Sequence, residues 1–140
     1  VDFQQLPCRR EPRGLLIVEF KNYYMLCTHL SLNEEDRVTS VGIIRDIVSK
    51  LNKPAFIAGD MNARPKSKPM MEFRKFAQVL NDDSKFTIPS NEPRACIDYI
   101  LGVNGQFKVK RDYVYSNVIA SDHLPLYVDV KIQKPKKAKK

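Results

Sequence analysis

Long apolar runs are missing from this chain of 140 residues, and cysteine and glycine are scarce, with 3 and 5 residues. No run approaches the roughly eighteen apolar residues of a membrane-spanning helix, so we do not expect the chain to cross a bilayer. The composition is 43% hydrophobic and 29% charged, with a mean hydropathy of -0.39, which excludes collagen, coiled coils and disordered polymers. We therefore expect one domain with a modest core.

The cysteines are Cys8, Cys27 and Cys96, an odd number at wide spacing with no CxxC pair. This pattern excludes a disulfide framework and a zinc ribbon, and it does not fix the compartment. Cys27 and Cys96 lie inside apolar runs, so we expect both to be small buried residues.

The net charge of +8 suggests a nucleic-acid or anionic-surface partner at first sight. Six of the lysines lie in residues 131–140, however, so residues 1–130 carry 18 basic against 16 acidic side chains. We expect residues 133–140 to form a solvated, Lys-rich tail, which is weak evidence for nucleic acid.

Apolar periodicity predicts an α/β (α+β) fold, a mixed sheet with helices on one or both faces. Residues 1–13 are polar and rich in proline, which indicates an entering loop. Helices are expected at residues 34–52 and about 70–80, and strands at residues 14–20, 23–30, 55–59, 86–88, 95–101, 112–118 and 126–132. Gly42 costs the first helix about 1 kcal/mol relative to Ala, unless it marks a close packing contact.

Polar segments follow four predicted strands, at the edge where α/β proteins build their sites. Asp60 and Asn62 are two apart on an extended segment, so both side chains point the same way. Their oxygens suit a hard cation such as Mg2+, or can hydrogen-bond a phosphate or its attacking water. The alternative is an ordinary turn in which both side chains bind backbone groups.

Two further segments place a carboxylate near an imidazole. Asp98 lies inside an apolar strand and needs a partner, for which His123 is the natural candidate; a structural aspartate bonded to backbone amides is the alternative. Asp122 would coordinate a metal ion while His123 contacts phosphate, or the pair would only cap a turn. His29, at another strand end, would donate to a phosphate oxygen or serve the structure alone.

The four segments HLS, GDMN, IDYI and SDHLP, in this order, resemble the C-terminal motifs of the endonuclease/exonuclease/phosphatase family of metal-dependent phosphoesterases. The resemblance runs from about residue 13 to residue 130. It implies a phosphate-ester substrate, Mg2+ or Mn2+ as cofactor, and in-line attack by water. The roles it implies are phosphate contact for His29, alignment of nucleophile, metal and phosphate for Asp60 and Asn62, orientation of the last histidine for Asp98, and metal ligand and catalytic histidine for Asp122 and His123.

The family's domain is a four-layer sandwich of two similar halves, and the first half supplies an early Asn and a metal-binding Glu. Neither precedes Gly14, and Glu19 lies too close to the His29 motif to be that Glu. Residues 14–132 therefore resemble the C-terminal half, and a start at Val1 without Met suggests a processed or cut chain. We expect the missing N-terminal half to be a partner and this chain alone to have little activity.

Two other functions fit the same residues. One is a non-catalytic module that binds nucleic acid or anionic lipid through its lysines. The other is an inert folding fragment that exposes the sheet face meant for the absent half. The loops at residues 64–69 and 90–94 carry cations that suit any phosphate, so nucleic acid, phospholipid and sugar phosphate all remain as substrates.

Overall fold

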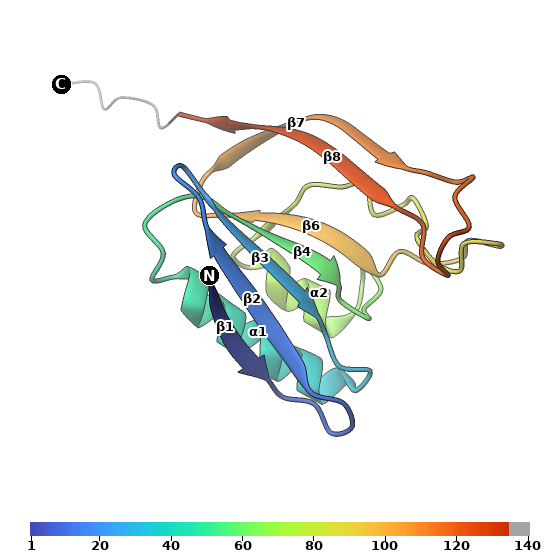
Figure 1. The fold of residues 1–140 in the computed structure, drawn as a ribbon, viewed down its shortest axis with the longest axis horizontal. Coiled ribbons are helices and arrows are strands. Elements are labelled where there is room, and N and C mark those ends of the chain that lie inside the picture. The colour runs from blue at the N-terminus through green and yellow to red at the C-terminus, as the bar shows by residue number, and fades with distance from the viewer. Residues whose placement is uncertain (135–140) are drawn as a thin grey trace.

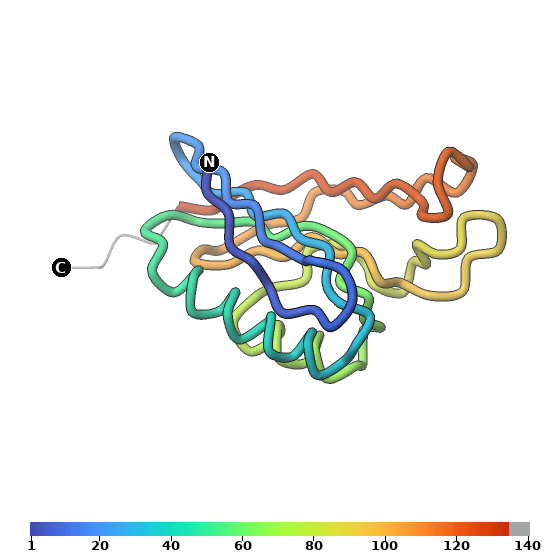
Figure 2. Tube along the Cα trace, turned by 60° about the horizontal axis from the view of Figure 1, so that its bottom comes forward, coloured from blue at the N-terminus to red at the C-terminus, as the bar shows by residue number. Residues whose placement is uncertain are grey.

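The computed structural model describes residues 1–134, in which a six-stranded sheet separates two helices from a two-stranded ribbon (Figure 1; Figure 2). The elements in chain order are β1 (Asp2–Leu6), β2 (Arg13–Glu19), β3 (Tyr24–His29), α1 (Glu34–Val48), β4 (Ala55–Asp60), α2 (Lys68–Arg74), β5 (Gln78–Val79), β6 (Asp98–Val103), β7 (Gln106–Val114) and β8 (Leu126–Gln133). No helix within residues 1–134 is long and apolar enough to cross a membrane.

The sheet has the strand order β1-β2-β3-β4-β6-β5, and only β3 and β4 run parallel. A parallel pair needs a crossover connection, which α1 provides here. Asn33 is the N-cap of this helix, and its side chain accepts a hydrogen bond from the Asp36 N–H. The first turn of the helix is acidic. Since β6 runs antiparallel to β4, it begins at the edge where β3 and β4 end.

The core lies between the helices and one face of the sheet. Alternate strand residues such as Leu26, Ile57 and Leu101 are fully buried there. The helices contribute Ile44 and Phe73, which are also fully buried. These contacts hold the central strands rigidly, and with them every side chain at the strand ends.

The β7–β8 ribbon covers part of the opposite face. Phe107 is 7% exposed and packs against Phe56, with the ring centroids 5.2 Å apart. Its ring lies over Gly102, where a Cβ atom would come within 2.7 Å of it. The ribbon therefore needs a residue without a side chain beneath Phe107.

Several predicted elements differ from the structure. Residues 2–6 form an edge strand instead of a loop, and α2 ends at Arg74 because the chain turns back to pair β5 with β6. Residues 86–88 form only an isolated bridge between Ile88 and Ala95. The strand predicted at residues 112–118 begins six residues earlier, at Gln106. Within the predicted tail, β8 continues to Gln133, while residues 135–140 lie outside the described part of the chain.

The outer part of the open sheet face is apolar and uncovered. Cys96 is buried as predicted, but the prediction for Cys27 is wrong: it is exposed, on the face turned away from the helices. In the sheet register Cys27 stands beside Leu16, which stands beside Phe3, and these two are 41% and 65% exposed. We call Phe3, Leu16 and Cys27 the open apolar row.

Two glycines should respond in opposite ways to replacement by alanine. Gly59 has a φ of +151°, and a Cβ there would lie 1.8 Å from the Thr28 carbonyl oxygen. Gly42 has no close packing contact, since its nearest heavy atom is an Arg45 nitrogen at 4.0 Å. Gly59→Ala should lower the free energy of unfolding by at least about 2 kcal/mol. Gly42→Ala should raise it by about 0.5–1 kcal/mol. Urea unfolding of both variants measures the difference, and equal effects would contradict this account.

Candidate active site

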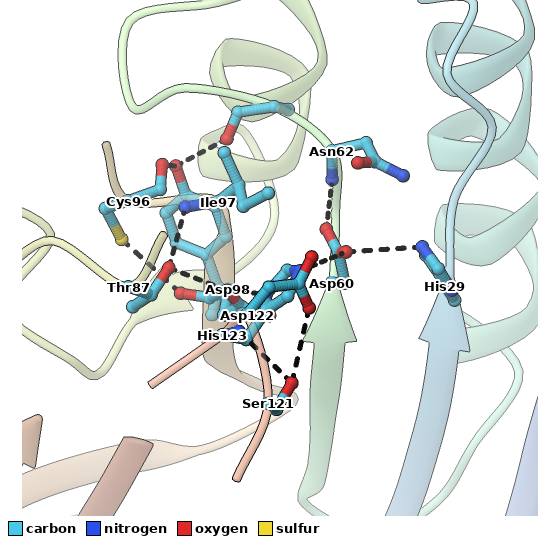
Figure 3. Close-up of polar contacts among 12 residues, drawn as sticks. His29, Asp60, Asn62, Thr87, Cys96, Ile97, Asp98, Ser121, Asp122 and His123 are labelled. Carbon is cyan, nitrogen blue, oxygen red and sulfur yellow. Dashed lines mark hydrogen bonds and ion pairs between the residues drawn. The ribbon is translucent and has the colours of Figure 1, made fainter. Parts of the chain in front are cut away.

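Three polar side chains meet where β3 and β4 end and β6 begins (Figure 3). The register pairs His29 with Asp60 and Asp60 with Asp98. Side chains that are direct neighbours in adjacent strands share a face, so all three point to the same side of the sheet. The His29 Nε2 atom lies 3.2 Å from Asp60 Oδ2.

His123 comes from the connection between β7 and β8 and completes this cluster. Its Nδ1 atom lies 2.8 Å from Asp98 Oδ2, and its Nε2 atom lies 3.5 Å from Asp60 Oδ2. The partner expected for Asp98 is therefore present. Asp98 Oδ2 also accepts a hydrogen bond of 2.6 Å from the Thr87 hydroxyl, which itself accepts from the Ile97 N–H at 3.2 Å.

Two groups of the cluster have shifted pKa values. Burial opposes protonation of His123, but the hydrogen bond to Asp98 and the charges of Asp98, Asp60 and Asp122 outweigh it, so the pKa of His123 is raised. Burial also raises the pKa of Asp60, and the charge of Asp98 adds to this, against the opposing hydrogen bond from the Asn62 N–H. The shift of Asp60 makes its carboxylate a stronger base, and the shift of His123 favours the protonated ring.

Asn62 fixes the segment that follows β4. Its backbone N–H donates to Asp60 Oδ1 at 2.8 Å, and its side-chain amide nitrogen donates to the Leu30 carbonyl oxygen at 2.8 Å. The residue has a φ of 47°, a left-handed conformation that Asn tolerates well. With its nitrogen committed to Leu30, the Asn62 side chain offers its oxygen as an acceptor.

Asp122 lies apart from the hydrogen-bonded cluster. It is exposed, and its carboxylate accepts from the Ser121 hydroxyl at 3.4 Å. The same hydroxyl accepts from the His123 N–H at 3.1 Å, which shapes the turn that delivers His123. The structure thus places Asp122 beside the cluster with its carboxylate open to solvent.

The side chains present suit a hard divalent cation. Asp60, Asp98 and His123 are the group within residues 1–134 whose ligand atoms all lie within 4.8 Å of one another. Asp98 Oδ2 already contacts His123 Nδ1 and the Thr87 hydroxyl, and both Asp60 oxygens have partners. Mg2+ is typically bound by one or two carboxylates with water and substrate oxygens, so the donor types suit it, and the ligand set of Asp60, Asn62 and Asp122 stays a prediction.

A hollow of about 440 Å³ lies beside the segment that follows β3. It is lined by Cys8, Arg9, Arg10, Glu11, Arg13, Ser31, Leu32 and Asn33. Arg9 is paired with Asp36 and Glu35. The Arg13 Nε atom is buried and has no hydrogen-bond partner among the described residues. Motif reasoning missed these arginines because residues 1–13 were interpreted as a loop. It also missed Thr87, since only its burial beside Asp98 reveals it.

We expect the Thr87 hydroxyl to stabilise the fold through its hydrogen bonds to the cluster. The residue is fully buried, and Thr87→Val leaves the Ile97 N–H without its acceptor and Asp98 without a donor. The variant should lose about 1–3 kcal/mol of unfolding free energy in urea. Thr39→Val is the matched control on an exposed helix position and should change by less than about 0.5 kcal/mol. A loss no larger than that of the control would contradict the assigned role.

The bond between Asp98 and His123 predicts a specific titration. Asp98→Asn removes the charge but leaves the ring buried, so the pKa of His123 should fall below its value in the unmodified chain. Proton NMR resolves this readily because the chain has only two histidines. A raised pKa also means that the pair stabilises the fold below the pKa of unfolded His and that this contribution is lost as pH rises through the folded pKa. Asp46→Asn, at an exposed site, should leave the titration unchanged.

The family model of the endonuclease/exonuclease/phosphatase family matches residues 2–123. No curated protein sequence matches the chain. A family protein from Bacteroides vulgatus superposes with a TM-score of 0.76 at 20% identity, covering 87% of this chain and 56% of that one. The mannosyl-6-phosphatase of Bacteroides thetaiotaomicron gives 0.71 at 20% identity, with 86% and 57% covered. The human nocturnin catalytic domain with bound sulfate gives 0.70 at 18% identity, with 95% and 59% covered.

Identity this low shows the shared fold alone, and it confirms the predicted fold class. The chain spans 56% and 57% of the length of the two bacterial relatives. The family model, by contrast, covers most of the residues and includes every polar segment of the cluster. This protein belongs to the endonuclease/exonuclease/phosphatase family.

Proposed function

We propose that this chain carries the catalytic residues of a metal-dependent phosphoesterase that cleaves a phosphate ester by in-line attack of water. The row of contacts from Asp98 through His123 and Asp60 to His29 is the observation that carries this proposal: Asp98 is hydrogen-bonded to His123, and the Nε2 atoms of His123 and His29 lie 3.5 Å and 3.2 Å from Asp60 Oδ2. It combines two carboxylates and two imidazoles, each partly exposed, within one strand-end cluster. Family membership supports a phosphoesterase chemistry for such a cluster.

Asp60 aligns and activates the attacking water. Its raised pKa makes it a stronger base than an ordinary carboxylate, and the N–H of Asn62 holds one of its oxygens in place. The other oxygen faces both imidazoles. A water held there lies between the base and the groups that receive the phosphate.

His123 and His29 bind the non-bridging phosphate oxygens. The raised pKa of His123 favours the protonated ring, which donates a charge-assisted hydrogen bond through Nε2. Asp98 holds Nδ1 and thereby fixes the tautomer and the direction of the ring. His29 is more exposed, with 55% of its side chain accessible, and reaches the phosphate from the solvent side.

The oxygens of Asp122, Asp60 and Asn62 would hold Mg2+ or Mn2+. When bound, the ion would neutralise charge that develops on the phosphate. Asp98 is reserved for His123 in this assignment, because Oδ2 already accepts from Thr87 and contacts Nδ1.

Further protein completes the site in this proposal. The open apolar row of Phe3, Leu16 and Cys27 crosses three strands on the face that carries the cluster, and a contiguous apolar surface of this kind suits a protein contact. The superposition leaves more than two fifths of each solved relative uncovered by this chain. We propose that an N-terminal half covers this row and adds metal ligands, so that the isolated chain turns over slowly.

Hydrolysis of bis(p-nitrophenyl) phosphate by the full-length natural protein tests the proposal. Asp60→Asn and His123→Gln should each lower kcat/KM by about 10²-fold or more, since each removes a group that contacts the reacting atoms. EDTA should abolish turnover, and Mg2+ or Mn2+ should restore it. Asp46→Asn is the control at an exposed site and should keep the unmodified rate.

Two outcomes separate the parts of this proposal. Near-normal turnover by Asp60→Asn, or turnover in EDTA, would overturn the assigned chemistry. Equal rates for the isolated chain and the full-length protein would overturn only the completion by an N-terminal half.

A further inference from the structure

The outer face of the β7–β8 ribbon carries a set of side chains that the proposed chemistry does not use. Phe107 and Ile132 oppose each other on the inner side, against the sheet. The register pairs Lys108 with Lys131 and Tyr113 with Tyr127 on the outer side, and all four are exposed. A ribbon of nine residues spans about 30 Å, so these groups form a long strip.

A bulge gathers the cations onto this one face. The register shifts between Val109 and Arg111, leaving Lys110 as an extra residue. Without this shift, strict alternation would turn Arg111 and Tyr113 toward the sheet. With it, the outer face presents Lys108, Arg111 and Lys131, with Lys110 at the bulge. Lys134 follows directly after β8 and lines the same hollow, and we call these five residues the basic cluster.

The basic cluster is not neutralised by its surroundings. Within residues 1–134, none of its members forms an ion pair with a carboxylate within 4.0 Å. Asp129 is the one acid in the paired register of this face, opposite Arg111. A hollow of about 530 Å³ lies among the lysines and has Ile132 and Gln133 as its further lining. The strip therefore attracts an extended polyanion.

Three tyrosines lie at the other end of the strip, beside the loop that delivers His123. Tyr113, Tyr115 and Tyr127 are 53%, 49% and 45% exposed, and we call them the tyrosine cluster. The rings of Tyr113 and Tyr115 have centroids 6.3 Å apart at an angle of 31°. Exposed aromatic rings next to a line of cations are the combination that binds single-stranded nucleic acid, by base stacking and by phosphate contact.

We propose that the outer face of the β7–β8 ribbon binds single-stranded nucleic acid, with bases stacked on the tyrosine cluster and phosphates along the basic cluster. The bound nucleic acid then runs from the lysines to the loop of Asp122 and His123. The inference deepens the proposed function, on which it rests, by naming the substrate class of that site. Binding itself is measured without turnover, so either proposal can fail alone.

Fluorescence anisotropy with a labelled oligothymidylate of about 15 nucleotides, in EDTA, tests the tyrosines in the full chain. Tyr113→Val with Tyr127→Val should weaken binding about fivefold or more, because the stacking rings are lost. Tyr113→Phe with Tyr127→Phe keeps both rings and should keep the affinity. Unfolding in urea confirms that both variants are folded. Equal affinity of the two variants would overturn the proposal.

Salt dependence tests the lysines. Lys108→Gln with Lys131→Gln should reduce the slope of log K against log salt by about 1.4, which corresponds to two single-strand phosphate contacts. Lys50→Gln with Lys75→Gln removes the same charge on the helix side and should leave the slope unchanged. The proposal fails if the two pairs behave alike, or if deleting residues 135–140 abolishes binding that the ribbon variants leave intact. It also fails if the ribbon variants lose affinity only for phosphatidylserine vesicles and keep their affinity for the oligonucleotide.

Discussion

The register of three strands is the constraint on which the site depends. Parallel pairing of β3 with β4 and antiparallel pairing of β4 with β6 bring His29, Asp60 and Asp98 to one edge. Slipping any of these strands by one residue would turn its polar end to the helix face. The buried apolar residues between those ends prevent such a slip, and Gly59 permits the close approach of β4 to the Thr28 carbonyl. Core packing thus sets the geometry of the candidate site.

The cluster combines two carboxylates that would repel each other in isolation. His123 lies between them and lowers this cost when it is protonated, so the proton and the arrangement support each other. Thr87 gives Asp98 a second donor without adding charge. Because Asp60 has only one backbone donor, it keeps the raised pKa of a partly buried group.

Sequence reasoning located the cluster because polar residues inside or directly after apolar runs cannot serve the core. The same logic predicted His29 and Asp60 at strand ends and Asp98 inside a strand, and the structure places Asp98 at the first residue of β6. It could not find Thr87, since a buried hydroxyl has no distinctive spacing. It missed the first part of β7 because four of the five residues at 108–112 are charged and no apolar run marks the strand there. It predicted Cys27 to be buried because an apolar run does not say which face of a strand is covered.

The two faces that remain open on this chain differ in chemistry. The open apolar row offers no charge and only the weak hydrogen-bonding group of a thiol, so water is a poor partner for it and protein is a good one. Along both strands of the ribbon, outward cations and tyrosines alternate with inward apolar residues. This alternation is typical of a sheet with one face in solvent. Lys131 belongs to that face, within β8. The β-sheet register therefore places part of the net positive charge on one face of the ribbon, which leads to the loop that carries His123. Composition alone does not show this arrangement.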